Sequence, residues 1–221
     1  PTGMAKFPYV NGALFADAMP AEFFTDDMRE ALLAACRFRW TRISPAVFGS
    51  MFQMVNSREA RRSGGEHYTT EANILKTLGP LFLDELQAEA DRLCRNATTT
   101  QKALEDFQTR LASNVYVDPA CGSGNFLSLA YGRLRDIETQ VIVELRRRRG
   151  TDAQMALDAT LETKLTIDQF HGIEISWWPA KIAETAMFLV DHQANHKLAL
   201  AVGEAPERLP ITITAHIHHT N

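Results

Sequence analysis

The sequence of 221 residues has no apolar run long enough to cross a membrane. A membrane helix needs roughly 18 consecutive apolar residues, and the N-terminus also lacks the basic segment and apolar core of a secretory signal. Hydrophobic residues nevertheless make up 45% of the chain, which is enough to bury a core. We therefore expect a soluble, globular, cytoplasmic protein with no membrane partner.

Cysteine is scarce and positive charge is not in excess. Cys36, Cys94 and Cys121 are odd in number and far apart, which favours reduced thiols over a disulfide framework. With 23 Lys and Arg against 27 Asp and Glu, the net charge of -4 does not provide a whole nucleic-acid footprint. The run Arg146 to Arg149 is the exception. It ends a predicted helix, where offsetting the helix dipole is favoured over direct contact with phosphate, and both interpretations stay open.

The amino-acid composition changes near residues 63–65, where a Ser-Gly-Gly run predicts a domain boundary. Residues 1–64 are expected to form a helical spacer, in which Thr25 caps a first helix and residues 45–55 form a second. The apolar stripe of the first helix is expected to pack against a neighbour; it comprises Met28, Leu32, Leu33, Cys36 and Trp40.

Residues 65–221 predict alternating helices and strands. Thr69 or Thr70 caps a helix through Leu78, which is interrupted at Gly79-Pro80 and resumes from Leu81 to Arg95. Strands are expected at residues 115–117, 170–175 and 211–217, and helices at 125–149, 151–165 and 177–200. This alternation predicts an α/β fold in which helices cover a parallel sheet.

The segment from Asp118 to Phe126 follows the first predicted strand, where open α/β sheets bind ligands. Gly122 and Gly124 allow a tight turn and the close approach of a ligand, and amides at the helix start offer donors. Leu127 stands where a dinucleotide fold needs a third glycine, and no Gly-Lys-Ser or Gly-Lys-Thr is present. Both of those phosphate-binding loops are therefore disfavoured.

Two carboxylates suggest the ligand. Asp118 beside the loop disfavours a pyrophosphate and favours a positive group, such as the ammonium of a methionine moiety. Glu174 ends the second predicted strand and can accept hydrogen bonds from both hydroxyls of a ribose, with Ile175 packing against an adenine ring. A solvated strand end is the alternative for Glu174. Together the two carboxylates predict S-adenosylmethionine as the cofactor.

Three motifs carry a resemblance to a known family. The segment Asp118-Pro119-Ala120-Cys121-Gly122-Ser123-Gly124-Asn125-Phe126 resembles motif I of the N6-adenine DNA methyltransferases. His67-Tyr68-Thr69-Thr70 is similar to their motif X, and Gly172-Ile173-Glu174-Ile175 to motif II. Motif X precedes motif I, as in the gamma-type enzymes of type I and fused type II restriction-modification systems. The resemblance implies a class I methyltransferase (Rossmann-like) sheet, incomplete at its C-terminal end and preceded by a helical segment.

The resemblance also implies roles for individual residues. The motif X residues Tyr68, Thr69 and Thr70 would bind the methionine carboxylate, the glycine loop would border the methionine part, and Asn221 would lie near the adenine edge. The full set of expected cofactor-binding residues is His67, Tyr68, Thr69, Thr70, Asp118, Pro119, Ala120, Gly122, Gly124, Asn125, Phe126, Glu174, Ile175 and Asn221. Glu174 follows Asp118 by 56 positions (174 minus 118) instead of the roughly 20 of compact units, so an inserted element is expected.

The residues that would transfer the methyl group are missing. Methylation of adenine N6 requires two acceptors that hold the amine of a flipped base, which the family supplies with Asn-Pro-Pro. None of the nine prolines follows an asparagine. We therefore expect no catalytic residue in this chain, a catalytic motif after Asn221, and double-stranded DNA bound largely through regions outside the chain. The resemblance leaves room for a restriction nuclease domain or subunit.

Several other interpretations stay open or are disfavoured. A metal site at His216, His218 and His219 is disfavoured because no further ligand lies close in sequence, and Cys121 lacks a nearby base that would make it a nucleophile. Trp177 and Trp178 either line an adenine pocket or dock the helix that follows. Methylation of RNA or protein glutamine, and a noncatalytic nucleoside-binding module, are the alternative functions.

Overall fold

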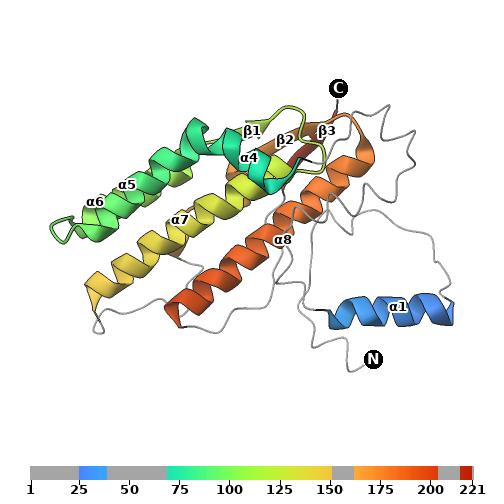
Figure 1. Ribbon diagram of the computed structural model, residues 1–221, viewed down its shortest axis with the longest axis horizontal. Helices are drawn as coiled ribbons and strands as arrows, with labels where there is room; N and C mark the ends of the chain where they lie inside the picture. The colour runs from blue at the N-terminus through green and yellow to red at the C-terminus, as the bar shows by residue number, and fades with distance from the viewer. Residues whose placement is uncertain (1–24, 39–68, 151–161, 204–214, 221) are drawn as a thin grey trace.

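The computed structural model describes residues 25–38, 69–150, 162–203 and 215–220. Their centre is a parallel sheet in the order β1-β2-β3, formed by β1 (Tyr116–Asp118), β2 (Phe170–Glu174) and β3 (His216–His219) (Figure 1). The register places Asp118 beside Gly172, and Glu174 beside His219. The carboxyl ends of all three strands therefore meet at one edge of the sheet.

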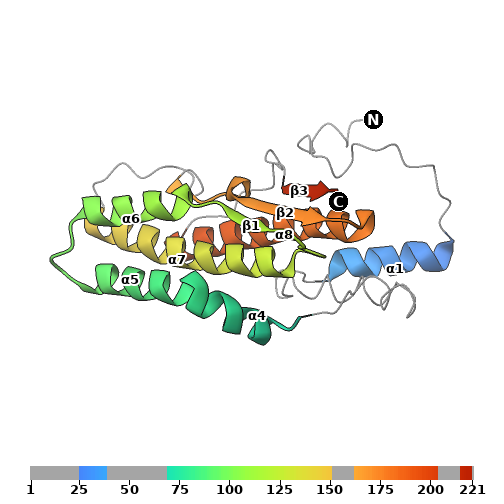
Figure 2. The same ribbon diagram turned by 90° about the horizontal axis from the view of Figure 1, so that it is seen from above.

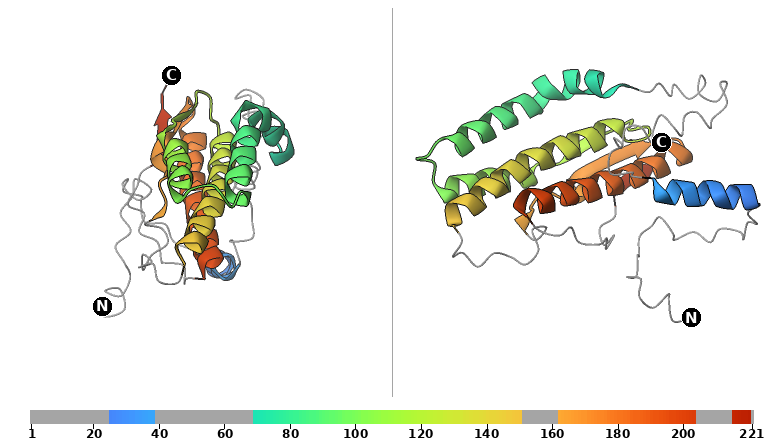
Figure 3. Two further views of the ribbon diagram at one scale, coloured as in Figure 1. Left: turned by 90° about the vertical axis from the view of Figure 1, so that its left-hand side faces the viewer. Right: turned by 60° about the horizontal axis from the view of Figure 1, so that its bottom comes forward.

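Two long helices cover one face of this sheet. α7 (Asn125–Arg149) leads from β1 towards β2, and α8 (Trp177–Val202) leads from β2 towards β3. Right-handed crossovers between strands in sequential order place both helices on the same face, and Figures 2 and 3 show α7 and α8 side by side beneath the sheet. Tyr131 and Leu134 of α7, Phe170 of β2 and Ala183 and Met187 of α8 are buried in the core between them. The predicted α/β fold is confirmed.

A further helical segment packs against α7 and also reaches the sheet, because the centroid of the Phe82 ring lies 5.2 Å from that of Tyr116 in β1. α4 (Glu71–Leu78), the π-helical turn η4 (Gly79–Leu83) and α5 (Asp84–Arg95) follow one another without a break. The α-helix ends at Leu78 as predicted, but the chain continues as a π-helical turn, and the α-helix resumes at Asp84 instead of Leu81. Proline removes one backbone donor, and a wider π turn accommodates that loss while the helix continues.

The helix α6 (Gln101–Ser113) was not predicted, although the sequence carries its signals. The Thr100 hydroxyl accepts a hydrogen bond from the Ala103 amide and caps its N-terminus. The residues that α6 buries follow helical spacing and are Leu104, Phe107, Gln108 and Leu111. This helix packs on α7 and leads directly into β1.

Most of the other predicted helices and strands begin and end within two residues of their observed positions. Two elements differ from the prediction. The third strand runs from His216 to His219, so it ends later than predicted, and residues 211–214 lie outside the described residues. The predicted helix 151–165 is described only from Glu162, and residues 163–166 form no helix. They pass instead beside α7, where the amides of Lys164 and Leu165 donate to the Glu138 carboxylate.

The first helix, α1 (Asp26–Arg37), is capped by Thr25 as predicted, because its hydroxyl accepts from the Met28 amide. None of its residues is buried, and Met28 and Leu32 are about half exposed, so the expected packing of its stripe is not found within the described part of the chain. Trp40, the second helix and the boundary at 63–65 lie outside it. Among the described residues, no helix has both the length and the apolar character needed to span a bilayer.

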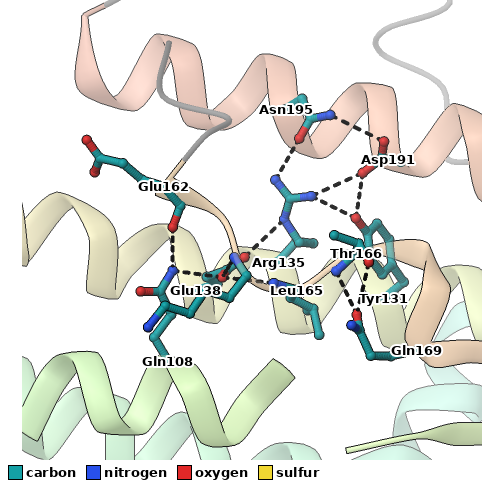
Figure 4. A network of polar contacts seen from close by, with 11 residues as sticks. Gln108, Tyr131, Arg135, Glu138, Glu162, Leu165, Thr166, Gln169, Asp191 and Asn195 are labelled. Carbon is teal, nitrogen blue, oxygen red and sulfur yellow. Dashed lines mark hydrogen bonds and ion pairs between the residues drawn. The ribbon is translucent and has the colours of Figure 1, made fainter. Parts of the chain in front are cut away.

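A buried polar network holds α7 and α8 together (Figure 4). Arg135 is 2% exposed and donates to Asp191 at 3.1 Å and to Asn195 at 2.7 Å, while the Tyr131 hydroxyl lies 2.5 Å from the same Asp191 carboxylate. Arg135 also lies 3.4 Å from Glu138, which is fully buried. Each buried charge of this network has an opposite partner, so removal of either partner would leave an uncompensated buried charge.

The arginine run at the end of α7 binds acidic groups of the same protein. Arg146 pairs with Glu162, Arg147 and Arg148 pair with Glu144, and Arg149 pairs with Glu105. The hydrogen bond from Arg147, with further help from Arg148, lowers the pKa of Glu144 to about 2. Arg148 also donates to carbonyls at the C-terminus of α5 and just beyond it, those of Leu93, Cys94 and Asn96. These arginines therefore form ion pairs near the C-terminus of α7. Arg148 also caps the C-terminus of α5.

Candidate functional site

The loop after β1 is a tight turn that leads directly into α7. The Asp118 carboxylate accepts a hydrogen bond from the Ala120 amide at 3.1 Å, and the Gly124 amide donates to the Cys121 carbonyl at 2.8 Å. Gly122 and Gly124 have φ values of +54° and +76°, in the left-handed region that side chains disfavour. This backbone requires both glycines, as the sequence suggested.

The same loop is fastened to β2. The Cys121 amide donates to the Ile173 carbonyl at 3.0 Å, and the Gly122 amide donates to the Glu174 carboxylate at 2.9 Å. A Cβ atom at Gly172 would lie only 2.7 Å from the Cys121 sulfur, so the loop rests closely on that strand. The structure thereby brings Asp118 and Glu174 to the same edge of the sheet.

The Glu174 carboxylate is held by backbone amides on both oxygens. Gly122 donates to Oε2, and Ser176 donates to Oε1 at 2.8 Å. A carboxylate oxygen can accept more than one hydrogen bond, so each oxygen retains acceptor capacity for a ligand. Glu174 is thus an oriented acceptor and not a loosely solvated strand end.

Burial and the nearby Glu174 charge raise the pKa of Asp118, while the hydrogen bond from the Ala120 amide lowers it. Two carboxylates at one edge favour a cation between or beside them. Burial, together with the same two negative charges, raises the pKa of the Cys121 thiol to about 12. The thiol is therefore protonated at neutral pH, which disfavours a nucleophilic role.

The remaining motif I and II residues surround the loop. Pro119 and Ala120 are exposed, and Ile175 is 61% exposed. Asn125 and Phe126 form the first turn of α7 and are partly buried, with Phe126 packed on the core. The backbone of Gly122 faces open space, because a Cβ atom there would meet nothing within 4 Å.

The motif X segment is described only in part. Thr70 caps α4 by accepting a hydrogen bond from the Asn73 amide, and Thr69 beside it is partly buried. Figures 1 and 2 place this end of α4 at the same end of the molecule as the start of α7. His67, Tyr68 and Asn221 lie outside the described residues.

The structure does not support docking of α8 by its two tryptophans. Trp177 and Trp178 are 50% and 42% exposed and stack on each other with ring centroids 5.6 Å apart, whereas α8 packs through Ala180, Ala183 and Met187.

The C-terminal histidines contact groups of the protein. His216 lies 3.2 Å from Asp168, and the His219 ring lies 3.0 Å from the Ile175 carbonyl. Within the described ranges, no group of three or more His, Cys, Asp or Glu side chains is arranged to hold a metal ion.

A family model and two known proteins are similar to this chain. Residues 94–221 match the family described as MmeI, DNA-methyltransferase domain. A curated relative, DNA methyltransferase A of Bacillus subtilis (strain 168), is 35% identical over 206 residues, which make up 93% of this chain and 22% of that protein.

The solved structure of the Type IIL restriction-modification enzyme MmeI in complex with DNA superposes with a TM-score of 0.86 at 44% identity. The similarity covers 99% of this chain and 28% of that chain. The present chain therefore spans less than a third of either protein.

Proposed function

This chain belongs to the family described as MmeI, DNA-methyltransferase domain, and on that premise we propose that it binds S-adenosylmethionine. The cofactor would serve methylation of adenine N6 in a specific DNA sequence by a longer restriction-modification protein. The observation that carries this proposal is the joint placement of Asp118 and Glu174 at one sheet edge, linked through the Gly122 amide.

The residues present fit the chemistry of this ligand. Asp118 is a carboxylate whose raised pKa favours a cationic neighbour, which suits the ammonium of the methionine part. Glu174 retains acceptors for ribose hydroxyls, and the open space at Gly122 lets a ligand approach the backbone. Thr69 and Thr70 lie at the start of α4, where a helix N-terminus favours an anionic carboxylate, and His67 and Tyr68 precede them.

When bound, S-adenosylmethionine supplies an electrophilic methyl group on a sulfonium. The residues of this chain would hold the cofactor in position and would not consume its methyl group. Asp118 would neutralise the ammonium, and the two backbone amides on Glu174 keep its carboxylate in place before a ligand arrives. Cys121 remains a buried, protonated thiol, so it does not compete for a methyl group as a thiolate would.

The acceptors that would hold the adenine amine are proposed to come from other parts of the full-length protein, since this sequence has no Asn-Pro-Pro. Binding of double-stranded DNA is proposed to lie largely in those parts as well. The ion pairs of Arg146 to Arg149 support this, because these arginines already neutralise acidic groups of the chain. A restriction nuclease domain or subunit would complete such a system.

Thermal melting with a panel of ligands tests the proposal. S-adenosylmethionine and S-adenosylhomocysteine should raise the melting temperature, whereas NAD and ATP should not, because a ligand that binds only the folded state stabilises it. Equal shifts with all four ligands, or none with the first two, would contradict S-adenosylmethionine binding.

A further inference from the structure

The peptide group that joins Ile175 to Ser176 is held at both of its ends. Its N–H belongs to Ser176 and donates a hydrogen bond to Glu174 Oε1 at 2.8 Å. Its carbonyl oxygen belongs to Ile175 and lies 3.0 Å from Nε2 of the His219 ring. A single peptide group therefore links His219, at the end of β3, to the carboxylate at the end of β2.

The direction of the His219 contact follows from its chemistry. A carbonyl oxygen has no hydrogen to donate, so Nε2 of the ring must carry the proton and act as the donor. The imidazolium and one of the two neutral tautomers both provide this donor. The contact therefore persists in either charge state, provided that the neutral ring keeps its proton on Nε2.

The position of His219 follows from the pairing of β3 with β2. The register places His219 beside Glu174, and the Thr220 amide donates to the Glu174 carbonyl at 3.0 Å. That bond continues the backbone ladder and needs no particular side chain. The Ile175 carbonyl lies one peptide group further along, where the chain has left β2, and there the donor is the side chain of His219.

We propose that His219 is a positioning residue for the Glu174 carboxylate and acts through the peptide group of Ile175 and Ser176. This inference rests on the proposed function, in which Glu174 accepts the ribose hydroxyls. A donor at the carbonyl end of a peptide group polarises the group and strengthens the donor at its N–H end. His219 thereby fixes the Ser176 amide and, through it, the direction in which the Glu174 oxygens face a ligand.

The other partner of the Glu174 carboxylate does not depend on His219. The Gly122 amide, in the loop after β1, donates to Oε2 at 2.9 Å. Loss of the His219 ring should therefore loosen the carboxylate without releasing it. Because one hydrogen bond contributes a modest net free energy, the expected loss of ligand affinity is roughly threefold to tenfold.

Two amide side chains of different length test the role of the donor. Both can donate from nitrogen, but glutamine reaches the position of histidine Nε2, whereas asparagine is one carbon shorter. His219→Asn should weaken the binding of S-adenosylhomocysteine by roughly threefold to tenfold in calorimetric titrations, and His219→Gln should retain most of the affinity. Equal losses in the two variants would overturn the proposal, because the donor would then not be the cause.

His218→Asn is the matched control for these variants. His218 belongs to the same strand, but side chains alternate along a strand, so it faces the other side of the sheet from His219. Its affinity for S-adenosylhomocysteine should equal that of the unaltered chain. Both histidines are exposed, so the variants should stay folded, and their melting temperatures check this.

A double variant distinguishes positioning of Glu174 from general support of the fold. If His219 acts through Glu174, adding His219→Asn to Glu174→Ala should cause no further loss of affinity, because the group that it positions is already gone. A full additional loss in the double variant would mean that His219 acts independently of Glu174, and would overturn the proposal.

The outcomes separate this inference from the proposed function. If S-adenosylhomocysteine binds the unaltered chain and the His219→Asn variant equally well, the positioning role is overturned and the cofactor site stands. Nitrogen NMR that finds the neutral His219 ring protonated on Nδ1 also overturns it, since that tautomer has no donor at Nε2. Absence of binding to the unaltered chain overturns the proposed function, and this inference with it.

Discussion

The amide of Gly122 donates a hydrogen bond to the Glu174 carboxylate across 2.9 Å, although the two residues stand 52 positions apart in sequence. A helix of 25 residues and a further connection lie between them. The loop after β1 and the end of β2 therefore form one unit, and the long insertion extends away from the site without dividing it.

Replacing Glu174 by alanine should weaken the binding of S-adenosylhomocysteine by about 1 to 3 kcal/mol, because charged hydrogen bonds to the ribose are lost. Isothermal titration calorimetry measures the change. Asp168→Asn is the matched control, since Asp168 lies before the amino end of β2 and contacts His216. Equal affinity in the Glu174 variant and the unaltered chain would remove the ribose role.

The affinity for S-adenosylhomocysteine should depend on pH through Asp118, whose pKa is raised above its ordinary value. A bound ammonium favours the ionised carboxylate, so binding lowers this pKa and releases a proton. Affinity should therefore be level at neutral pH and fall as the pH drops through the pKa of ligand-free Asp118. Titrations at several pH values check this. Asp118→Asn should bind more weakly with a flatter profile, and an unchanged slope in that variant would assign the effect to another group.

Gly124→Ala should destabilise the fold more than Gly203→Ala. The two glycines have nearly the same left-handed backbone, with φ and ψ of 76° and 22° for Gly124 and 78° and 23° for Gly203. A Cβ atom at Gly124 would lie 2.9 Å from that of Ala183, whereas at Gly203 it would meet nothing within 4 Å. The backbone cost of about 1 to 2 kcal/mol is shared, and overpacking adds about 1 to 3 kcal/mol at Gly124. Urea unfolding of both variants measures the difference, and equal losses would exclude the close contact with α8.

Arg135→Met should cost about 3 to 5 kcal/mol of stability, because it leaves the buried carboxylate of Glu138 and that of Asp191 without their cation. Lys197→Met is the matched control. Lys197 joins the same two helices through Asp136 at 2.9 Å, but its side chain is 63% exposed. An exposed pair contributes up to about 1 kcal/mol. Chemical denaturation compares the two, and similar small losses would mean that the network of Figure 4 adds little.

The chain by itself should not methylate DNA, because it has no Asn-Pro-Pro motif to hold the adenine amine. Incubation with cofactor carrying a labelled methyl group and with DNA of mixed sequence should leave the DNA unlabelled. A longer protein that includes the missing motif is the positive control. Strong labelling by the chain alone would place the catalytic acceptors among residues 1–221.

Local signals predicted the elements that depend on neighbouring residues. Thr25 and Thr70 cap their helices as expected, and α7 begins at Asn125 and ends at Arg149 as the apolar spacing and Gly150 indicated. The α-helix ends before Gly79-Pro80 as predicted, but a π turn carries the chain on into α5, because surrounding packing decides whether a helix continues past a proline. The helix α6 was missed for a different reason, because the Thr100 cap and the apolar spacing after it were both present in the sequence.

The chemistry at the edge of the sheet follows from the order of the amino acids: two glycines that permit a tight turn, one carboxylate before them and another at the next strand end. Each of these features depends only on residues that are close in sequence, so it can be recognised without the fold. The contact partners of these and other side chains depend on the three-dimensional fold. Gly122 reaches Glu174 because β1 pairs with β2. Arg135 reaches Asp191 and Arg148 reaches the end of α5 because α7 packs against α8 and α5. Such contacts depend on the register of whole helices, which no local pattern encodes.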